Sequence, residues 1–297
     1  MPHVHRWDIG RPRLLLHILH GMAEHGARYQ RLAAELNAHG IAVWAHDHRG
    51  HGLTAASRAD LGHFGDSYGW RLLVDDAWEV SRAMMATYPR LPIALFAHSM
   101  GSFIGQTLLS EQGNSYRAVV LCGTSGPPDA QEHFLRILSR AQRRALGGRS
   151  PGSWLDSLMI RMFNKRFEPR KTNFDWLSRD EEEVSTYVND CLCGFPLTAQ
   201  AWFDFLHGKR RLGSDKHIDK IPRTLPIRVI AGTRDPVGEE TKGVQRLLNL
   251  YRKKGLTISS QFYGEARHEL VNELNKCDVT TDLIDWLIQF APRSEPA

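Results

Sequence analysis

The sequence predicts an α/β fold in which a mostly parallel central sheet is flanked by helices and carries an inserted helical cap. Two observations support this prediction. First, short apolar runs alternate with segments of helical hydrophobic period, which is the pattern of parallel strands joined by helical crossovers. Second, the alternation stops at Gly126-Pro-Pro and returns only at residues 226–231. A wholly helical segment between two strands of one sheet is typical of a cap.

The first 125 residues supply four strands of the expected sheet. Residues 13–20 form a continuous apolar run that ends at Gly21, as a strand buried on both faces does. A helix is expected over residues 27–39, and the strand that follows it leads into a loop rich in histidine. The N-terminus has room for little more than one further strand, around residues 4–9. The other elements expected here are strands over 41–45, 93–96 and 118–122, a helix over 70–88, and a helix from Met100.

The second half of the chain contains the cap and the end of the core. Apolar residues recur at helical spacing over residues 134–145 and 154–162, which predicts two amphipathic helices. We therefore expect residues 1–125 and 220–297 to form the core and residues 126–219 to form the cap. The core elements expected after the cap are strands over 226–231 and 257–263 and helices over 239–253 and 279–290.

The composition is that of an ordinary soluble globular protein. The 297 residues can bury a full core, and they are 42% hydrophobic and 24% charged. The apolar runs are too short to cross a bilayer and the N-terminus lacks a signal-peptide pattern, so we expect a cytoplasmic protein. A net charge of +5 is too small and scattered to indicate nucleic-acid binding. The four cysteines, among them Cys191 and Cys193, lack disulfide-framework or zinc-ligand spacing, so no metal site is expected.

One short motif follows the strand at residues 93–96. Residues 97–101 read Ala-His-Ser-Met-Gly, which matches the pattern small-x-Ser-x-Gly. In this pattern a sharp turn between strand and helix exposes a nucleophilic serine and places the next amide at a helix N-terminus. Ala97 stands where glycine is usual, and we expect its extra methyl group to weaken the site slightly. The alternative is that Ser99 only caps the helix, since serine is a favoured N-cap residue.

A serine hydroxyl becomes a useful nucleophile when a histidine takes its proton and a carboxylate holds that histidine. Asp235 directly follows the strand at residues 226–231, and His268 follows the last strand. Because the carboxyl ends of parallel strands meet at one edge of a sheet, we expect Ser99, Asp235 and His268 to come together there. The alternative for Asp235, which precedes a proline, is a plain turn. The order serine, acid, histidine favours a catalytic triad.

The oxyanion that forms during attack on a carbonyl needs two amide donors. The amide of Met100, at the start of a helix, is one candidate. The amide of Met22 is the other, because its loop follows the 13–20 strand at the same edge of the sheet. Gly21 lets this backbone approach closely. We expect the polar residues of the loop to orient it rather than to react; these residues are His20, Glu24 and His25.

A second loop, at residues 46–52, contains three histidines together with Asp47 and Arg49. One interpretation is a metal site. The other is a hydrogen-bonded loop braced by an Asp47–Arg49 pair. The set of tetrahedral ligands is incomplete, which favours the hydrogen-bonded loop.

Basic residues dominate residues 131–171 of the cap. One face of the first cap helix carries Arg136, Arg140, Arg143 and Arg144. The plain interpretation is a solvated helix face. The alternative is peripheral contact with an anionic membrane surface, in which the basic residues lie at the headgroups. The side chains expected to enter the lipid are then Trp154, Met159 and Phe163.

Five segments carry a resemblance to a known family: residues 20–29, 46–52, 98–101, 232–238 and 266–273. Together they resemble the monoacylglycerol lipase and lysophospholipase branch of the α/β hydrolases, which is also labelled serine aminopeptidase. The resemblance runs over nearly the whole chain, including the cap. It implies an α/β-hydrolase fold without metal or cofactor. The site residues it implies are a triad of Ser99, Asp235 and His268 and an oxyanion hole formed by the Met22 and Met100 amides.

The resemblance also implies a carboxylic ester hydrolase that acts on a lipid ester, a monoacylglycerol or a lysophospholipid, through an acyl-enzyme intermediate. A long acyl chain gains affinity by burial, so we expect an apolar pocket beneath the cap. The residues expected to line it are Trp154, Met159, Phe163, Phe195 and Trp202. Two alternatives stay open: a small-ester or peptide hydrolase on the same scaffold, and a non-catalytic binding protein that uses the pocket without turnover.

Overall fold

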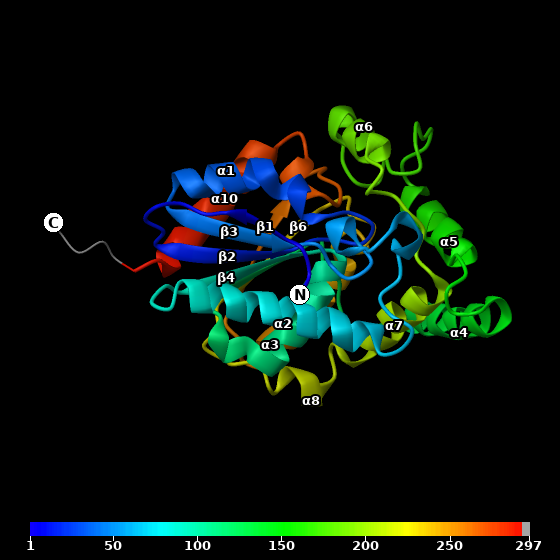
Figure 1. Cartoon of the computed structure of the whole chain (residues 1–297), viewed down its shortest axis with the longest axis horizontal. Coiled ribbons are helices and arrows are strands. Elements are labelled where there is room, and N and C mark those ends of the chain that lie inside the picture. The colour runs from blue at the N-terminus through cyan, green and yellow to red at the C-terminus, as the bar shows by residue number, and fades with distance from the viewer. Residues whose placement is uncertain (293–297) are drawn as a thin grey trace.

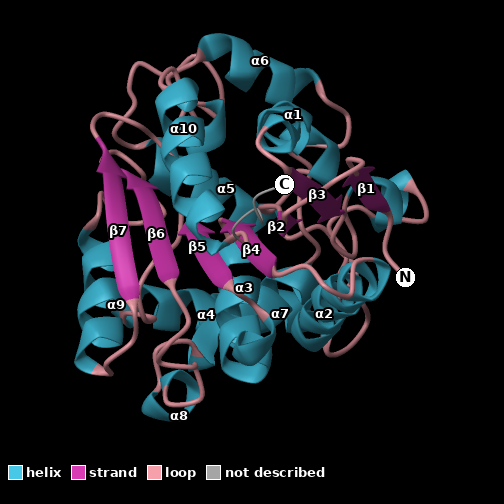
Figure 2. Cartoon of the chain, turned by 90° about the vertical axis from the view of Figure 1, so that its left-hand side faces the viewer, coloured by secondary structure: helices cyan, strands magenta, loops and turns pink. Residues whose placement is uncertain are grey.

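The computed structural model describes residues 1–292, in which seven strands form one sheet. The strands are β1 (Val4–Trp7), β2 (Leu14–Leu19), β3 (Ile41–His46), β4 (Ile93–His98), β5 (Ala118–Cys122), β6 (Ile227–Gly232) and β7 (Ile258–Tyr263). Their order in the sheet is β1-β3-β2-β4-β5-β6-β7 (Figures 1 and 2). β1 pairs antiparallel with β3, and the other neighbouring pairs are parallel. The mostly parallel sheet is confirmed, and the N-terminal segment supplies one antiparallel edge strand.

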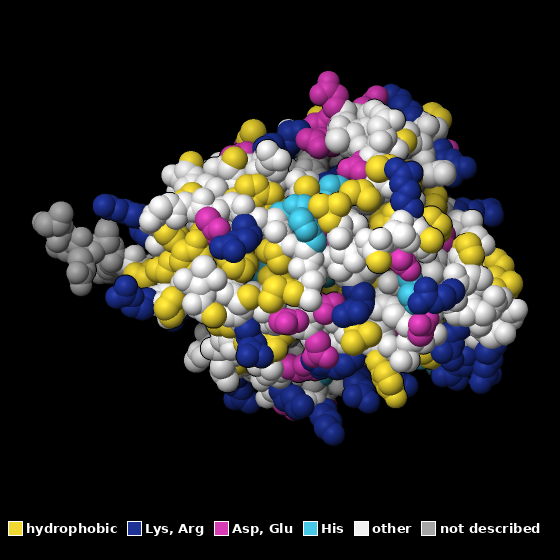
Figure 3. Space-filling view, in the orientation of Figure 1, with side chains coloured by type: hydrophobic (Ala, Val, Ile, Leu, Met, Phe, Trp, Pro, Cys, Tyr) yellow, Lys and Arg dark blue, Asp and Glu magenta, His cyan; other side chains and the backbone are white. Residues whose placement is uncertain are grey.

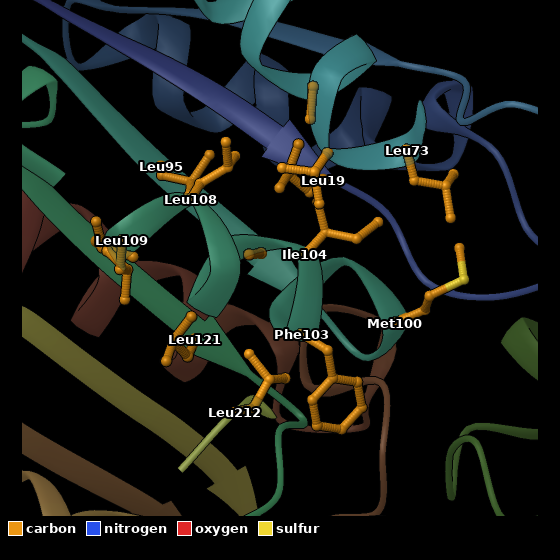
Figure 4. Close-up of a cluster of buried hydrophobic side chains, with 14 of the residues drawn as sticks. Leu19, Leu73, Leu95, Met100, Phe103, Ile104, Leu108, Leu109, Leu121 and Leu212 are labelled. Carbon is orange, nitrogen blue, oxygen red and sulfur yellow. The ribbon is translucent and has the colours of Figure 1, made fainter. Parts of the chain in front are cut away.

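Two hydrophobic cores lie on opposite faces of the sheet, because successive side chains of a strand point to opposite faces. On β2, Leu19 belongs to the first core and Leu16 to the second. Figure 4 shows the first core, in which Ile104 and Leu108 lie in the same cluster as Leu19. The first core is covered by α2 (Gly69–Thr87), α3 (Met100–Gln112) and α9 (Lys242–Lys253), and the second by α1 (Gln30–Ala38) and α10 (Lys276–Leu287).

The core helices start and end within about one helical turn of their expected positions, and local turns explain the differences. Residues 26–29 form a separate 3₁₀ turn, so α1 begins at Gln30. α9 begins at Lys242 rather than at residue 239 because Glu239, Glu240 and Thr241 all have positive φ angles. Such angles are incompatible with a right-handed helix.

The segment between β5 and β6 contains five helices and no strand of the sheet, which agrees with the expected helical cap. These helices are α4 (Ala130–Leu146), α5 (Ser153–Asn164), α6 (Glu181–Asn189), α7 (Ala199–Gly208) and α8 (Asp215–Ile218). Figure 1 shows α4, α5 and α6 beyond one end of the sheet. Ile218 of α8 packs in the first core, and the domain boundaries at 126 and 219 stay a prediction. None of the helices within residues 1–292 is both long and apolar enough to span a bilayer.

Candidate active site

Ser99 occupies the turn between β4 and α3, with a φ of 51° and a ψ of −120°. A positive φ is strained for a residue with a Cβ atom, and it is the conformation expected of a serine at a sharp strand-to-helix turn. Within the described chain, the Ser99 side chain makes no capping hydrogen bond to α3, which argues against the helix-cap interpretation. Glycine at position 101 allows α3 to approach β2, since a Cβ atom on Gly101 would lie 2.3 Å from the carbonyl oxygen of Leu19.

Asp235 and His268 lie on the loops that follow β6 and β7, and both side chains are buried. Nδ1 of His268 and Oδ1 of Asp235 are 2.9 Å apart. Burial lowers the pKa of His268, but the charge and hydrogen bond of Asp235 raise it more, so the pKa lies above the ordinary 6.5. Among residues 1–292, Nε2 of His268 has no hydrogen-bond partner. The His268 ring lines the same cavity as Ser99, so the structure places all three residues at one edge of the sheet.

The amides of Met22 and Met100 come from the loop after β2 and from the first residue of α3. Both residues line the cavity together with Ser99. Neither amide donates a hydrogen bond to another group in the described part of the chain. A hydrogen bond at the residue after Met22 holds this loop in place: the amide of Ala23 donates to Nε2 of His51 (3.1 Å). Two amide N–H groups are thereby available beside the serine.

A cavity of about 570 Å³ extends from Ser99 and His268 under the cap. It is lined by four of the five pocket residues expected from the sequence: Met159, Phe163, Phe195 and Trp202. The fifth expectation is wrong, because the Trp154 side chain is 51% exposed on the outer surface of α5 and does not line the cavity. Residues five positions apart on a helix point about 140° apart, so Trp154 turns away from the cavity when Met159 faces it.

A buried ion-pair network, which sequence reasoning missed, links the loop of Met22 to the loop of His268. Arg28 donates to both carboxylate oxygens of Glu269 (2.8 and 2.7 Å) and to Glu24 (2.8 Å). Burial is the largest single influence and raises the pKa of Glu269, but the charge and hydrogen bonds of Arg28, with smaller contributions from His98 and Asn272, together outweigh it and hold the pKa below the ordinary 4.5. The sequence analysis expected Glu24 to orient its loop. It could not predict the pairing of Arg28 with Glu269, because these residues lie 241 positions apart and no local pattern joins them.

Trp176 is a second residue near the site to which the sequence analysis gave no role. Its ring lies against His268 with centroids 5.0 Å apart, and Phe163 lies 4.7 Å away on α5. The indole nitrogen is buried and has no partner among the described residues. Trp176 comes from a cap loop between α5 and α6, where hydrophobic periodicity gives no information about orientation.

The histidine-rich loop at residues 46–52 is hydrogen-bonded, but not by the expected ion pair. Asp47 accepts hydrogen bonds from the amide of Leu53 (2.7 Å) and from Nε2 of His5 (3.0 Å). Arg49 instead pairs with both carboxylate oxygens of Asp76 on α2, each at 2.9 Å. The predicted Asp47–Arg49 pair is therefore wrong, because the guanidinium turns outward to α2 while the carboxylate turns inward to the loop backbone.

Known proteins with similar sequences agree with the function that this geometry suggests. Residues 10–275 match the family described as serine aminopeptidase, S33. A monoglyceride lipase homolog of Monkeypox virus is 34% identical over 278 residues, which cover 93% of this chain and 90% of that protein. The monoglyceride lipase of Homo sapiens is 27% identical over 269 residues, which cover 89% of this chain and 78% of that protein.

Solved structures agree with the sequence matches. A thermostable carboxyl esterase from Bacillus coagulans, in complex with glycerol, superposes with a TM-score of 0.87 and 31% identity over 97% of this chain and 94% of that chain. A lipase in its open form superposes with a TM-score of 0.88 and 26% identity over 98% of this chain and 94% of that chain. This chain therefore belongs to the serine aminopeptidase S33 family of α/β hydrolases, in its monoacylglycerol lipase branch.

Proposed function

We propose that this protein is a serine esterase that cleaves lipid esters, with Ser99, Asp235 and His268 as its catalytic triad. The observation on which the proposal rests is the pairing of a buried imidazole with Asp235. This pairing leaves Nε2 without a partner among residues 1–292, in a cavity shared with Ser99. That is the arrangement in which a histidine can accept the proton of a serine hydroxyl. The similar proteins named monoglyceride lipase favour an acylglycerol as substrate.

The chemistry follows from these positions. His268 takes the hydroxyl proton of Ser99 as Oγ attacks the ester carbonyl, and the amides of Met22 and Met100 stabilise the oxyanion. The imidazolium, stabilised by Asp235, gives its proton to the leaving alcohol, and the acyl group stays on Oγ. Water then attacks the acyl-enzyme, with His268 as base, and releases the fatty acid and the free serine.

The cavity lining favours a neutral headgroup on the substrate. Its apolar part, which includes Phe163 and Trp202, suits an acyl chain. Its polar part contains more acidic than basic side chains: the acids are Glu24, Asp129, Glu132, Asp156, Glu239, Glu240 and Glu269, and the bases are Arg166, Lys209, Arg234 and Lys242. An excess of negative charge disfavours a phosphate group, so we favour a monoacylglycerol over a lysophospholipid.

A substrate panel with a labelling control tests this proposal. We expect a fluorophosphonate probe to label the native protein but not Ser99→Ala. In the same preparation, monoacylglycerols should be hydrolysed faster than lysophospholipids, short p-nitrophenyl esters or aminoacyl amides. Faster turnover of short esters or amides would support the small-ester or peptide hydrolase instead. A folded protein that binds monoacylglycerol but is neither labelled nor active would be the non-catalytic binding protein.

We further propose that α4 and α5 make peripheral contact with an anionic membrane surface. Large apolar side chains of these helices are exposed, whereas the residues that α4 buries include the polar Ser139 and Gln142. Figure 3 shows hydrophobic and basic side chains side by side at the edge where Figure 1 places the cap helices. The sequence analysis expected Met159 and Phe163 to enter the lipid, but both side chains face the cavity, so we leave them out of this contact. The exposed apolar residues are Phe134, Ile137, Leu146 and Trp154.

Vesicle sedimentation tests the membrane contact. We expect binding to phosphatidylglycerol vesicles that weakens with added salt and is weaker for phosphatidylcholine. Arg140→Gln and Arg144→Gln should each weaken the free energy of vesicle binding by about 1 kcal/mol. The matched control is Arg90→Gln, because Arg90 is exposed in the loop before β4, at the end of the sheet away from the cap. Equal binding by the double variant and the control would exclude a role for the arginine stripe.

A further inference from the structure

Three side chains with metal-binding chemistry meet where the cap contacts the Met22 loop. His25 belongs to that loop, and Asp190 and Cys193 belong to the turn after α6. One donor atom from each residue, a nitrogen, an oxygen and a sulfur, lies within 4.8 Å of the other two. The sequence spacing of Cys191 and Cys193 gave no reason to expect a metal site. The set that the structure brings together instead combines Cys193 and Asp190 with His25, which lies on a loop distant in the sequence. Cys191 itself is exposed.

Backbone hydrogen bonds hold this turn in shape without occupying the donor atoms. The carbonyl of Asp190 accepts the amide of Cys193 (3.0 Å), and Oδ1 of Asp190 accepts the amide of Leu192 (2.8 Å). Oδ2 of Asp190 accepts a hydrogen bond from Nε2 of the His25 imidazole (2.8 Å), so these two donor atoms are joined to each other and a metal ion would replace the shared proton. The next residue, Gly194, donates to the carbonyl of Ala23 (2.9 Å), which docks the turn onto the Met22 loop.

The donor set suits Zn²⁺, which accepts mixed nitrogen, sulfur and oxygen ligands in tetrahedral geometry. With bonds of about 2.0–2.3 Å, the donors of a formed zinc site lie roughly 3.3–3.8 Å apart. The three donors therefore need to move by about 1 Å or less from their present positions. The Asp190 side chain is 30% exposed, which provides a path for the ion and room for a water as the fourth ligand.

The surrounding charges favour a cation at this position. Burial is the largest influence on the Cys193 thiol and raises its pKa well above the ordinary 9; among the charged groups, Arg28 lowers this pKa, and Asp190, Glu24 and Glu269 raise it. The guanidinium of Arg28 is already engaged by Glu24 and Glu269. Three carboxylates thus surround one guanidinium, which leaves an excess of negative charge for a divalent ion to neutralise.

We propose that His25, Asp190 and Cys193 form a Zn²⁺ site that fastens the cap to the Met22 loop. Binding breaks the hydrogen bond between His25 and Asp190 and forms Zn–N, Zn–O and Zn–S bonds. The proton on Nε2 of His25 moves to Nδ1 through solvent, and the proton of the Cys193 thiol is released to solvent. Zinc then stabilises the docked cap, because it binds the folded arrangement and bridges two segments far apart in sequence. The site uses none of the three triad residues, so it goes beyond the esterase proposal and does not depend on it.

Cobalt titration of the metal-free full-length protein tests the site, because Co²⁺ occupies such sites and a thiolate ligand gives a sulfur-to-cobalt charge-transfer band. We expect one equivalent of Co²⁺ to produce the band, Zn²⁺ to abolish it, and Zn²⁺ to raise the melting temperature. Cys191→Ser should behave like the native protein, and Cys193→Ser should lose both the band and the zinc-dependent thermal shift. Ser99→Ala, which removes the proposed nucleophile, should bind metal normally.

Asp190→Asn provides a second variant that keeps the thiol and removes one anionic ligand. We expect its Co²⁺ affinity to fall about tenfold or more, with the charge-transfer band still reached at saturation. A native protein without the band, or a Cys193→Ser variant with the band unchanged, would overturn the proposal. Loss of the band in Cys191→Ser alone would likewise overturn it, because the thiolate would then be the wrong one.

Discussion

Arg28 and Glu269 form a buried bidentate ion pair, with nitrogen–oxygen distances of 2.8 and 2.7 Å. Arg28 lies just before α1, and Glu269 directly follows His268. The same guanidinium also binds Glu24 at 2.8 Å, two residues after Met22. The position of the proposed oxyanion amide relative to the proposed base therefore depends on one buried cation.

Replacing Arg28 by leucine should destabilise the fold and lower activity together. The substitution leaves Glu24 and Glu269 buried without a counter-charge, and breaking a buried ion pair typically costs about 3–5 kcal/mol. We expect the free energy of unfolding in urea to fall by that order and kcat/KM for an ester to fall as well. Adding Glu24→Gln and Glu269→Gln should restore part of the stability. No recovery in the triple variant would show that packing by the Arg28 stem, rather than charge, is what matters.

Trp176 should influence the pH at which the enzyme works. Its ring lies against His268 and keeps water from the imidazole, and burial is the largest effect that lowers the pKa of His268. Trp176→Ala admits water, so we expect the pKa of His268 to rise. Because the neutral imidazole is the base, the acid limb of the kcat/KM profile should then move to higher pH. Trp176→Phe keeps an aromatic ring and should leave the limb in place; a shift to lower pH in Trp176→Ala would contradict this account.

Ala97 and Gly105 should be coupled, because a Cβ atom on Gly105 would lie 3.0 Å from the Cβ of Ala97. The extra methyl group of Ala97 is thus accommodated by the missing side chain of Gly105 on α3. In a helix, alanine is about 1 kcal/mol more favourable than glycine. We expect Gly105→Ala to raise the free energy of unfolding by that amount only when it is combined with Ala97→Gly. Alone, Gly105→Ala should leave the free energy of unfolding unchanged or lower it.

Urea unfolding of both single variants and the double variant measures this coupling as a double-mutant cycle. In contrast to the slight weakening expected from the sequence, Ala97→Gly alone should leave kcat/KM close to that of the native protein, because Gly105 accommodates the methyl group of Ala97. Additive stability changes would mean that strand and helix adjust independently and that the two residues are not coupled.

The triad and oxyanion-hole residues that the sequence predicted share one property: each follows a strand within a few residues. Ser99, Asp235 and His268 follow β4, β6 and β7, so knowledge of a parallel sheet was enough to bring them to one edge. The Met22 and Met100 amides were predicted for the same reason. Here, order along the chain and sheet topology determine position in space.

The expectations that failed depended on contacts that the local sequence does not encode. Arg49 is two residues from Asp47, but it reaches Asp76 on α2 because the loop backbone separates the two side chains. Periodicity identified the apolar residues of α5 but could not say that Met159 faces the cavity and Trp154 the solvent. That choice is set by how the cap docks on the core, which involves segments far apart in the chain.

Buried histidines should make the protein sensitive to acid. His17 on β2 donates or accepts through both ring nitrogens, to Ser81 (2.8 Å) and to His46 (3.0 Å). Burial lowers the pKa of His17 to about 3 and that of His51 to about 4, and it lowers the pKa of His46 as well. The folded state therefore keeps these rings neutral at a pH where the unfolded chain, with a histidine pKa near 6.5, takes up protons.

A group with a lowered folded-state pKa of this kind stabilises the fold fully above about pH 6.5 and loses that contribution as the pH falls toward the folded-state value. Each such histidine should remove about 1.4 kcal/mol of unfolding free energy per pH unit in that window. We expect His17→Gln, which keeps polar atoms toward Ser81, to flatten the dependence by close to one proton in urea unfolding at successive pH values. His39→Gln is the matched control because His39 is exposed in the folded protein. A stability that stays constant from neutral to mildly acid pH would mean that the buried rings are protonated and solvated in the folded state.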